Sequence, residues 1–188
     1  MKNLQRLNEI ARPVRIAMLI LLVSLSLAEL FTLSIAKALV CILINLMLCY
    51  VSVTDMLDGK IYTRDVAIIL ALSIASHFLT TMPIAERLVA MVLVFAVCFL
   101  CMFVTAKISK TKALNVLGMG DVRLLSVSGF LLGFSVIYSI MLSCIMELVF
   151  VFINKRRQGA KVTGDIHVRF GPYIALPVAF FLYGIMLS

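Results

Sequence analysis

Two aspartates, Asp55 and Asp121, interrupt a mainly apolar sequence and are the side chains best suited to chemistry. Asp55 closes an apolar run in "VSVTDMLDGK", and Asp121 follows two glycines in "GMGDVRLL". If their carboxylates meet, the like charges cannot both ionise and the pair shares one proton. The ionised member can then activate water while the protonated member polarises a peptide carbonyl. Such a pair predicts aspartic proteolysis, with no metal, no cofactor and no covalent intermediate.

The glycines before Asp121 suit this role. Gly118 and Gly120 allow backbone conformations closed to other residues and let another part of the chain approach closely. The same four residues also fit a plain glycine-rich turn in which Asp121 caps a helix. Residue chemistry alone leaves the two interpretations open.

Asp58 is the rival of Asp55 for the first catalytic acid, because it would share the same helix face three positions later. The simplest interpretation of Asp58 and Asp65 is a solvated loop beside Lys60 and Arg64. A sharper hypothesis is that the two acids attract a basic peptide segment, since they stand out in an otherwise cationic region.

The remaining reactive side chains give no competing site. Cys98 and Cys101 form a CxxC inside an apolar run, without the further ligands that zinc requires. His77 and His167 have no partners spaced for a metal or a catalytic triad. We therefore expect no metal site, no cofactor and no disulfide framework.

The elements that must position the acids are predicted to be membrane helices. The 188-residue chain is 63% hydrophobic and 14% charged, with a mean hydropathy of +1.15, far from the averages of soluble domains. We expect one domain over residues 1–188, an all-α, polytopic helical bundle with six to seven transmembrane helices. Apolar segments run over 16–35, 38–54, 66–82, 84–106, 121–132, 134–153 and 170–187. The fifth is short, and Gly129 and Gly133 are predicted to break it from the sixth.

The basic residues predict how the bundle is oriented. If the N-terminus is cytoplasmic, only Lys37 and Arg87 of the 17 Lys and Arg residues fall in outer segments. The basic residues behind the net charge of +8 then border the spans, where they face anionic lipid. Nucleic acid is therefore not an expected partner. This topology puts Asp55 and Asp121 at the cytoplasmic edge of the membrane, where ionisable groups are candidate functional sites. Glu29 and Glu147 fall inside spans, where we favour structural roles.

Three blocks of the sequence resemble the type IV prepilin peptidases, membrane aspartic proteases of the GxGD type. "VTDMLDGKIYT" at 53–63 is similar to the block in which an aspartate is followed six residues later by an aliphatic residue, here Ile61. "GMGDVRLLSVSGFLLG" at 118–133 is similar to the block of the second aspartate, with Arg123 where lysine is more usual. "RFGPYIALP" at 169–177 is similar to the segment that opens the last helix.

The resemblance implies roles for single residues and a substrate. Asp55 and Asp121 would be catalytic, and Gly118, Gly120 and Arg123 would support the catalytic loop. Candidate substrate contacts are Asp58, Asp65, Phe170, Gly171 and Pro172. The expected substrate is a type IV prepilin or a pseudopilin, cut between a basic leader and an apolar helix at the cytoplasmic face of the inner membrane.

Two departures from the family limit the expected activity. Tyr62 stands where the family often has proline, which leaves the local loop geometry open. The cytoplasmic insertion with paired CxxC motifs of bifunctional members has no counterpart, so we expect peptidase activity without use of S-adenosylmethionine. The alternatives are a GxGD intramembrane protease with another substrate, in which "ALP" at 175–177 would be the later proline motif, and a proton-coupled transporter. The sequence does not specify the oligomeric state.

Overall fold

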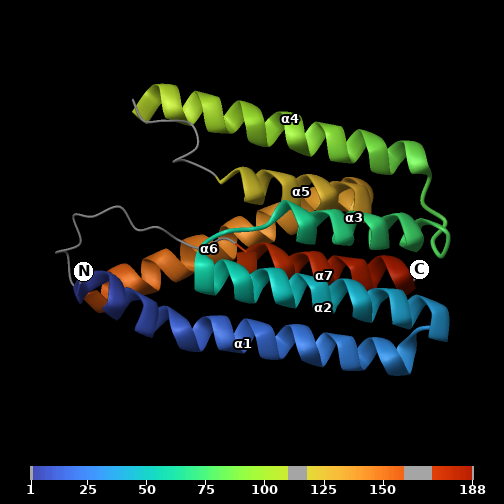
Figure 1. Ribbon diagram of the computed structural model, residues 1–188, viewed down its shortest axis with the longest axis horizontal. Coiled ribbons are helices and arrows are strands. Elements are labelled where there is room, and N and C mark those ends of the chain that lie inside the picture. Colours follow the sequence, from blue (N-terminus) through green and yellow to red (C-terminus); the bar gives the residue numbers. More distant parts are fainter. Residues whose placement is uncertain (1, 110–117, 159–170, 188) are drawn as a thin grey trace.

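A computed structural model of the chain describes residues 2–109, 118–158 and 171–187 (Figure 1). These residues form seven α-helices and one 3₁₀ turn, and no strand occurs among them. The helices are α1 (Lys2–Thr32), α2 (Ile35–Asp58), α3 (Thr63–His77), α4 (Ile84–Ser109), α5 (Met119–Leu132), α6 (Val136–Gln158) and α7 (Gly171–Leu187), with η2 (Gly133–Ser135) between α5 and α6. The predicted all-α fold is confirmed.

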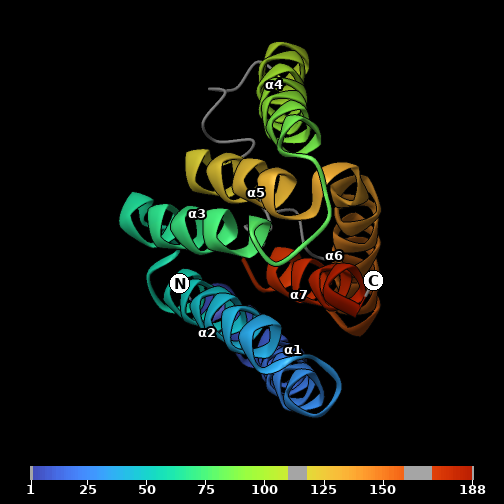
Figure 2. The same ribbon diagram turned by 90° about the vertical axis from the view of Figure 1, so that its right-hand side faces the viewer.

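The helices lie side by side along the long axis of the molecule (Figure 1). α7 is central and packs against α1, α2, α5 and α6. α4 lies at the edge of the bundle, where it packs against α5 and η2 (Figure 2). α2 ends where α5 and α7 begin, on the left of Figure 1, and we call this the site end. The opposite end, where α5 and α7 finish, is the far end.

A buried stripe on α2 explains how this helix faces the core. Its buried side chains include Ile44, Leu48, Val51 and Asp55, which recur at spacings of three and four residues. These aliphatic side chains belong to the core where α2 packs against α3 and α7, whereas large apolar side chains such as Phe31 and Ile35 remain exposed on the outside. Asp55 therefore continues an apolar stripe into the core, and the outer surface suits contact with lipid.

The chain turns sharply after α5. Gly133 adopts φ +56°, a conformation that other residues rarely take, and it ends α5. The predicted break at Gly133 is thus confirmed, and α6 runs back toward the site end (Figure 1). The predicted break at Gly129 is wrong, because Gly129 lies inside α5. A Cβ atom there would lie 3.0 Å from the carbonyl oxygen of Ala90, so this glycine permits close packing of α5 on α4.

Among the described residues, three segments have the length and apolar composition to cross a membrane, namely Ile35–Asp58, Ile84–Val104 and Met119–Phe150, the last containing the turn at Gly133. Shorter apolar stretches are Ile16–Thr32 and Gly171–Leu187. The protein is a membrane protein. The number of crossings and the cytoplasmic side remain predictions. The largest difference from the predicted bounds is at α1, which begins at Lys2 instead of residue 16. α3 differs less and runs from Thr63 to His77 instead of 66–82.

Candidate active site

Asp55 lies in the last turn of α2 and is held against the first residue of α7. Gly59, the residue after α2, has a left-handed conformation (φ 67°) and caps the helix by donating its N–H to the Asp55 carbonyl. The Asp55 side chain is only 6% exposed, and its Oδ2 accepts a hydrogen bond of 3.0 Å from the backbone N–H of Gly171. Free N–H groups at a helix N-terminus favour a nearby carboxylate. The start of α7 therefore orients Asp55.

Gly171 is the residue that permits this contact. A Cβ atom at position 171 would lie 2.9 Å from Oδ2 and 3.0 Å from Cβ of Asp55. Both distances are shorter than van der Waals contact, and Asp55 is enclosed on its other sides. Of the predicted segment 170–172, Gly171 and Pro172 are buried, whereas Phe170 lies outside the described residues.

Asp121 occupies the first turn of α5 and is partly exposed. Gly118 is the N-cap residue, and its backbone hydrogen-bonds to the Asp121 carboxylate. Asp121 is therefore not the N-cap residue that the sequence allowed: it lies three residues later, where an acid can bond back to the backbone of the N-cap residue. This bond at the start of α5 also orients the carboxylate, so it is compatible with the catalytic interpretation.

Asp121 lies within reach of the charges of two other carboxylates. The charges of Asp55 and Glu147 both act on Asp121. The close approach involves the neighbouring residues too, since a Cβ atom on Gly120 would lie 2.8 Å from Cβ of Ile61. Ile61 was noted in the sequence only as an aliphatic residue after Asp55. The structure shows its physical role, which is to pack the α2–α3 loop onto the backbone that precedes Asp121.

The loop between α2 and α3 is closed by hydrogen bonds of its own. The Tyr62 hydroxyl donates to Asp58 Oδ2 at 3.1 Å, and this bond raises the pKa of Tyr62. Asp58 is exposed, whereas Asp55 is buried, so α2 turns only Asp55 into the bundle. Arg123 of α5 donates to the hydroxyl of Thr63, the first residue of α3. The two blocks of sequence are thus joined on both sides of Asp121.

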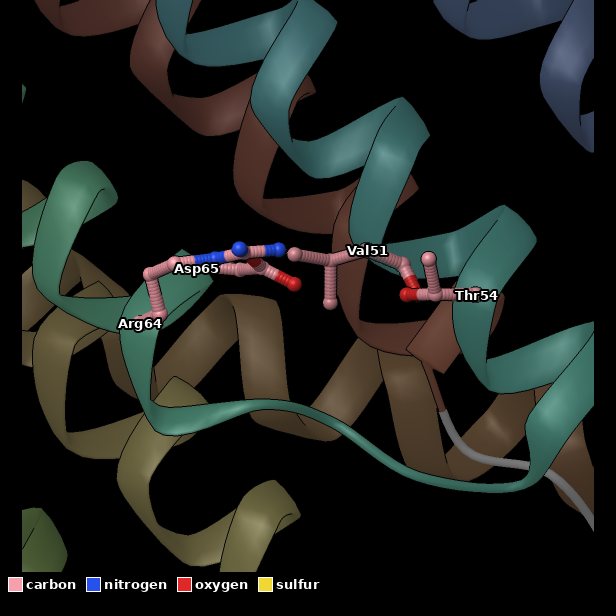
Figure 3. A network of polar contacts seen from close by, with 4 residues as sticks. All are labelled: Val51, Thr54, Arg64 and Asp65. Carbon is pink, nitrogen blue, oxygen red and sulfur yellow. The ribbon is translucent and has the colours of Figure 1, made fainter.

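Asp65 differs from the solvated loop residue that the sequence suggested. It lies in the first turn of α3, is 1% exposed, and accepts an ion-pair contact of 3.3 Å from Arg64 Nε. Figure 3 shows Arg64 and Asp65 extending together from α3 toward Val51 and Thr54 of α2. Asp65 Oδ2 has no hydrogen-bond partner among the described residues. Asp65 is therefore part of the α2–α3 contact and not of the open surface.

The two acids expected within spans have separate surroundings. Glu29 of α1 is fully buried and accepts bonds of 2.8 and 3.0 Å from the Asn45 amide of α2. This pair joins two helices away from the site. Glu147 of α6 is the third carboxylate near Asp121, a proximity that its position in the sequence does not reveal.

The arrangement provides two acids from separate helices, one buried and one partly exposed, at one end of the bundle. No group of three His, Cys, Asp or Glu side chains suited to a metal occurs in the described part of the chain. A carboxylate pair of this kind can hold a water molecule and exchange a single proton with it, which is the chemistry of hydrolysis.

The comparisons with known proteins agree with this chemistry. A family model described as the type IV leader peptidase family matches residues 41–152, a stretch that contains Asp55, Asp121 and Glu147. No curated protein and no solved structure matches the chain.

Proposed function

Because the chain belongs to the type IV leader peptidase family, we propose that it is a membrane aspartic endopeptidase whose catalytic pair is Asp55 and Asp121. Family membership makes the protein a peptidase with a protein substrate. The observation that supports the proposed pair is that the charge of Asp55, on α2, acts on Asp121, on α5, while Ile61, six residues after Asp55, packs against Gly120, next to Asp121.

In the proposed reaction, the ionised aspartate takes a proton from water as the water oxygen attacks the scissile carbonyl carbon. The protonated aspartate hydrogen-bonds to the carbonyl oxygen and stabilises the developing negative charge. Proton transfer to the amide nitrogen then breaks the C–N bond and restores the shared proton. Gly171 and Gly118 orient the two carboxylates through backbone hydrogen bonds, so little reorganisation is needed during the reaction.

We propose type IV prepilins or pseudopilins as the substrates. In such a substrate a basic leader precedes an apolar helix, and the bond between them would lie at the membrane edge. Asp121 and Gly118 are accessible from outside the bundle, whereas Asp55 is buried, so the scissile bond would approach from the side of α5. This requires the site end to face the cytoplasm, as the predicted orientation has it. Exposed Asp58 is then placed to attract the basic leader.

Cleavage of candidate prepilins in membranes tests the proposal. Wild type, Asp55→Asn, Asp58→Asn and Asp121→Asn are compared at matched expression, with the leader-sized shift as the readout. Loss of cleavage in Asp55→Asn and Asp121→Asn but not in Asp58→Asn is the expected result. If all four proteins cut alike, the catalytic assignment is wrong; if none cuts, the substrate class is wrong.

A further inference from the structure

Arg87, near the start of α4 at the far end, is a fully buried cation. The topology expected from sequence placed it in an outer segment. Its guanidinium instead points inward and donates to the Ser76 hydroxyl at 3.4 Å, to the Thr80 hydroxyl, and to the backbone carbonyl of Phe130 at 3.4 Å. The guanidinium carbon also lies 5.9 Å from the centre of the Phe130 ring. Among the described residues no carboxylate lies within ion-pair distance of it.

A buried guanidinium is costly unless its donors are satisfied. Its two terminal nitrogens are bonded by the end of α3, by Thr80 just beyond it and by the last turn of α5, which finishes at Leu132. Nε has no hydrogen-bond partner among the described residues. Carbonyls in the last turn of a helix lack intrahelical partners, and the helix end carries partial negative charge. Arg87 thus donates a hydrogen bond to a carbonyl in the last turn of α5 and places a positive charge beside the negative end of that helix.

Two further contacts fix the same end of α5. Glu86, next to Arg87, accepts a hydrogen bond of 3.3 Å from the backbone N–H of Phe134, just beyond α5. One turn further along α4, the backbone of Ala90 lies directly against Gly129. The first two turns of α4 therefore hold the far end of α5 through a cation, an anion and a close backbone contact.

The other end of α5 carries Asp121. Asp121 precedes Phe130 by nine residues, which is about 14 Å along a straight helix. An α-helix of this length transmits a shift or rotation of one end to the other. We propose that Arg87 is a positioning residue: by fixing the far end of α5, it sets the depth and rotation at which Asp121 faces Asp55. This inference rests on the proposed function of the two aspartates.

A bridging measurement tests the inference without relying on proteolysis. In a chain whose five native cysteines are replaced, Asp55→Cys and Asp121→Cys provide two thiols at the site. Dibromobimane, which fluoresces when it bridges two thiols, reports how readily they meet. We expect Arg87→Ala to slow bridging at least fivefold, and Arg87→Lys, which keeps the charge and a single donor nitrogen, to slow it less. The parent protein is the one that carries both site cysteines and native Arg87. If its two thiols do not bridge, both the inference and the catalytic pair are contradicted.

The matched control is Asn45→Ala, which removes a buried polar contact between α1 and α2 and leaves α5 untouched. It should lower thermal stability and keep the bridging rate within twofold of the parent. If Arg87→Ala does not accumulate in membranes, Ser76→Ala combined with Thr80→Val loosens the guanidinium while keeping it. An Arg87→Ala rate within twofold of the parent, or no slower than that of Asn45→Ala, would overturn the inference.

Kinetics with the native aspartates then separate positioning from the proposed function. Arg87→Ala should lower kcat about tenfold with KM within twofold, and Arg87→Lys should recover part of kcat. Slower bridging with an unchanged kcat would overturn a positioning role. If the parent enzyme cuts no prepilin while bridging responds to Arg87, the proposed substrate fails and the mechanical link from Arg87 to Asp121 stands.

Discussion

Asp55 and Asp121 are held by different parts of the bundle and in different ways. Asp55 lies on the buried stripe of a 24-residue helix and is fixed locally, by the N–H of Gly171 at the start of α7. Asp121 lies in the first turn of a 14-residue helix, is partly exposed, and has a local bond to the Gly118 backbone. By the inference above, the placement of its helix depends in addition on α4. One acid is thus fixed by contacts at the site alone, and the other also by a contact at the opposite end of the molecule. The two sides of the site should respond differently to substitution.

The largest effect should come from removing either acid, where the two sides are equivalent. We expect Asp55→Asn and Asp121→Asn each to lower kcat by about 10²–10⁴-fold, the usual contribution of general acid–base groups. Because the pair acts as a unit, the kcat of the double variant should be no lower than that of the less active single variant. Single-turnover cleavage measures this. Multiplicative losses would show that the two acids work independently.

The shared proton also predicts the pH dependence. At low pH both carboxylates are protonated and no base remains; at high pH both are ionised and no acid remains. The rate should therefore follow a bell whose two apparent pKa values belong to the pair. Measuring kcat/KM against pH, with chelator present throughout, checks this. A rate that falls on chelation, or that only rises with pH, would contradict the mechanism.

The next largest effects should separate the two sides. A Cβ atom on Gly171 or on Gly118 would lie 2.9 Å from a carboxylate oxygen of Asp55 or Asp121, respectively. At Gly171 the added methyl also meets Cβ and Cγ of a buried side chain, whereas at Gly118 it meets a partly exposed one that can rotate. Overpacking costs about 1–3 kcal/mol, equivalent to about 5- to 150-fold in rate. We therefore expect Gly171→Ala to lose activity within this range and Gly118→Ala to lose clearly less. Equal losses would mean that Asp121 is as tightly enclosed as Asp55.

A comparison of the two far-end cations sharpens the same contrast. Lys37 donates to the carbonyl of Met186 at 2.9 Å, in the last turn of α7, much as Arg87 donates to the last turn of α5. Lys37 is only partly buried and makes a single bond, and Asp55 is already fixed by local contacts at the other end of α7. Lys37→Ala should therefore change kcat less than threefold. A loss as large as that of Arg87→Ala would show that α7 is positioned remotely too.

The sequence predicted much of this arrangement because the relevant signals are local. Apolar run lengths located all seven helices, and residue types near helix ends singled out Asp55 and Asp121. The burial of Arg87 could not be predicted in this way. A cation three residues into an apolar run usually borders the membrane, and only the packing of α3 and α5 around it supplies the acceptors that its terminal nitrogens bind. Ile61 and Glu147 were missed as neighbours of the Asp121 turn for the same reason, since tertiary contacts bring them there.

The smallest effect is expected at Asp58, which tests whether the exposed side of α2 contacts substrate. Its bond to Tyr62 is solvent-exposed, so Tyr62→Phe should change the free energy of unfolding by less than about 0.5 kcal/mol. If Asp58 attracts a basic leader, Asp58→Asn should raise KM two- to fivefold at low salt, with the difference vanishing at high salt because screening removes the attraction. Tyr62→Phe leaves the Asp58 charge in place and should not change KM. A KM that is equal in all three proteins at every salt concentration would assign Asp58 to the loop alone, and recognition of the leader would then have to come from the side of α5.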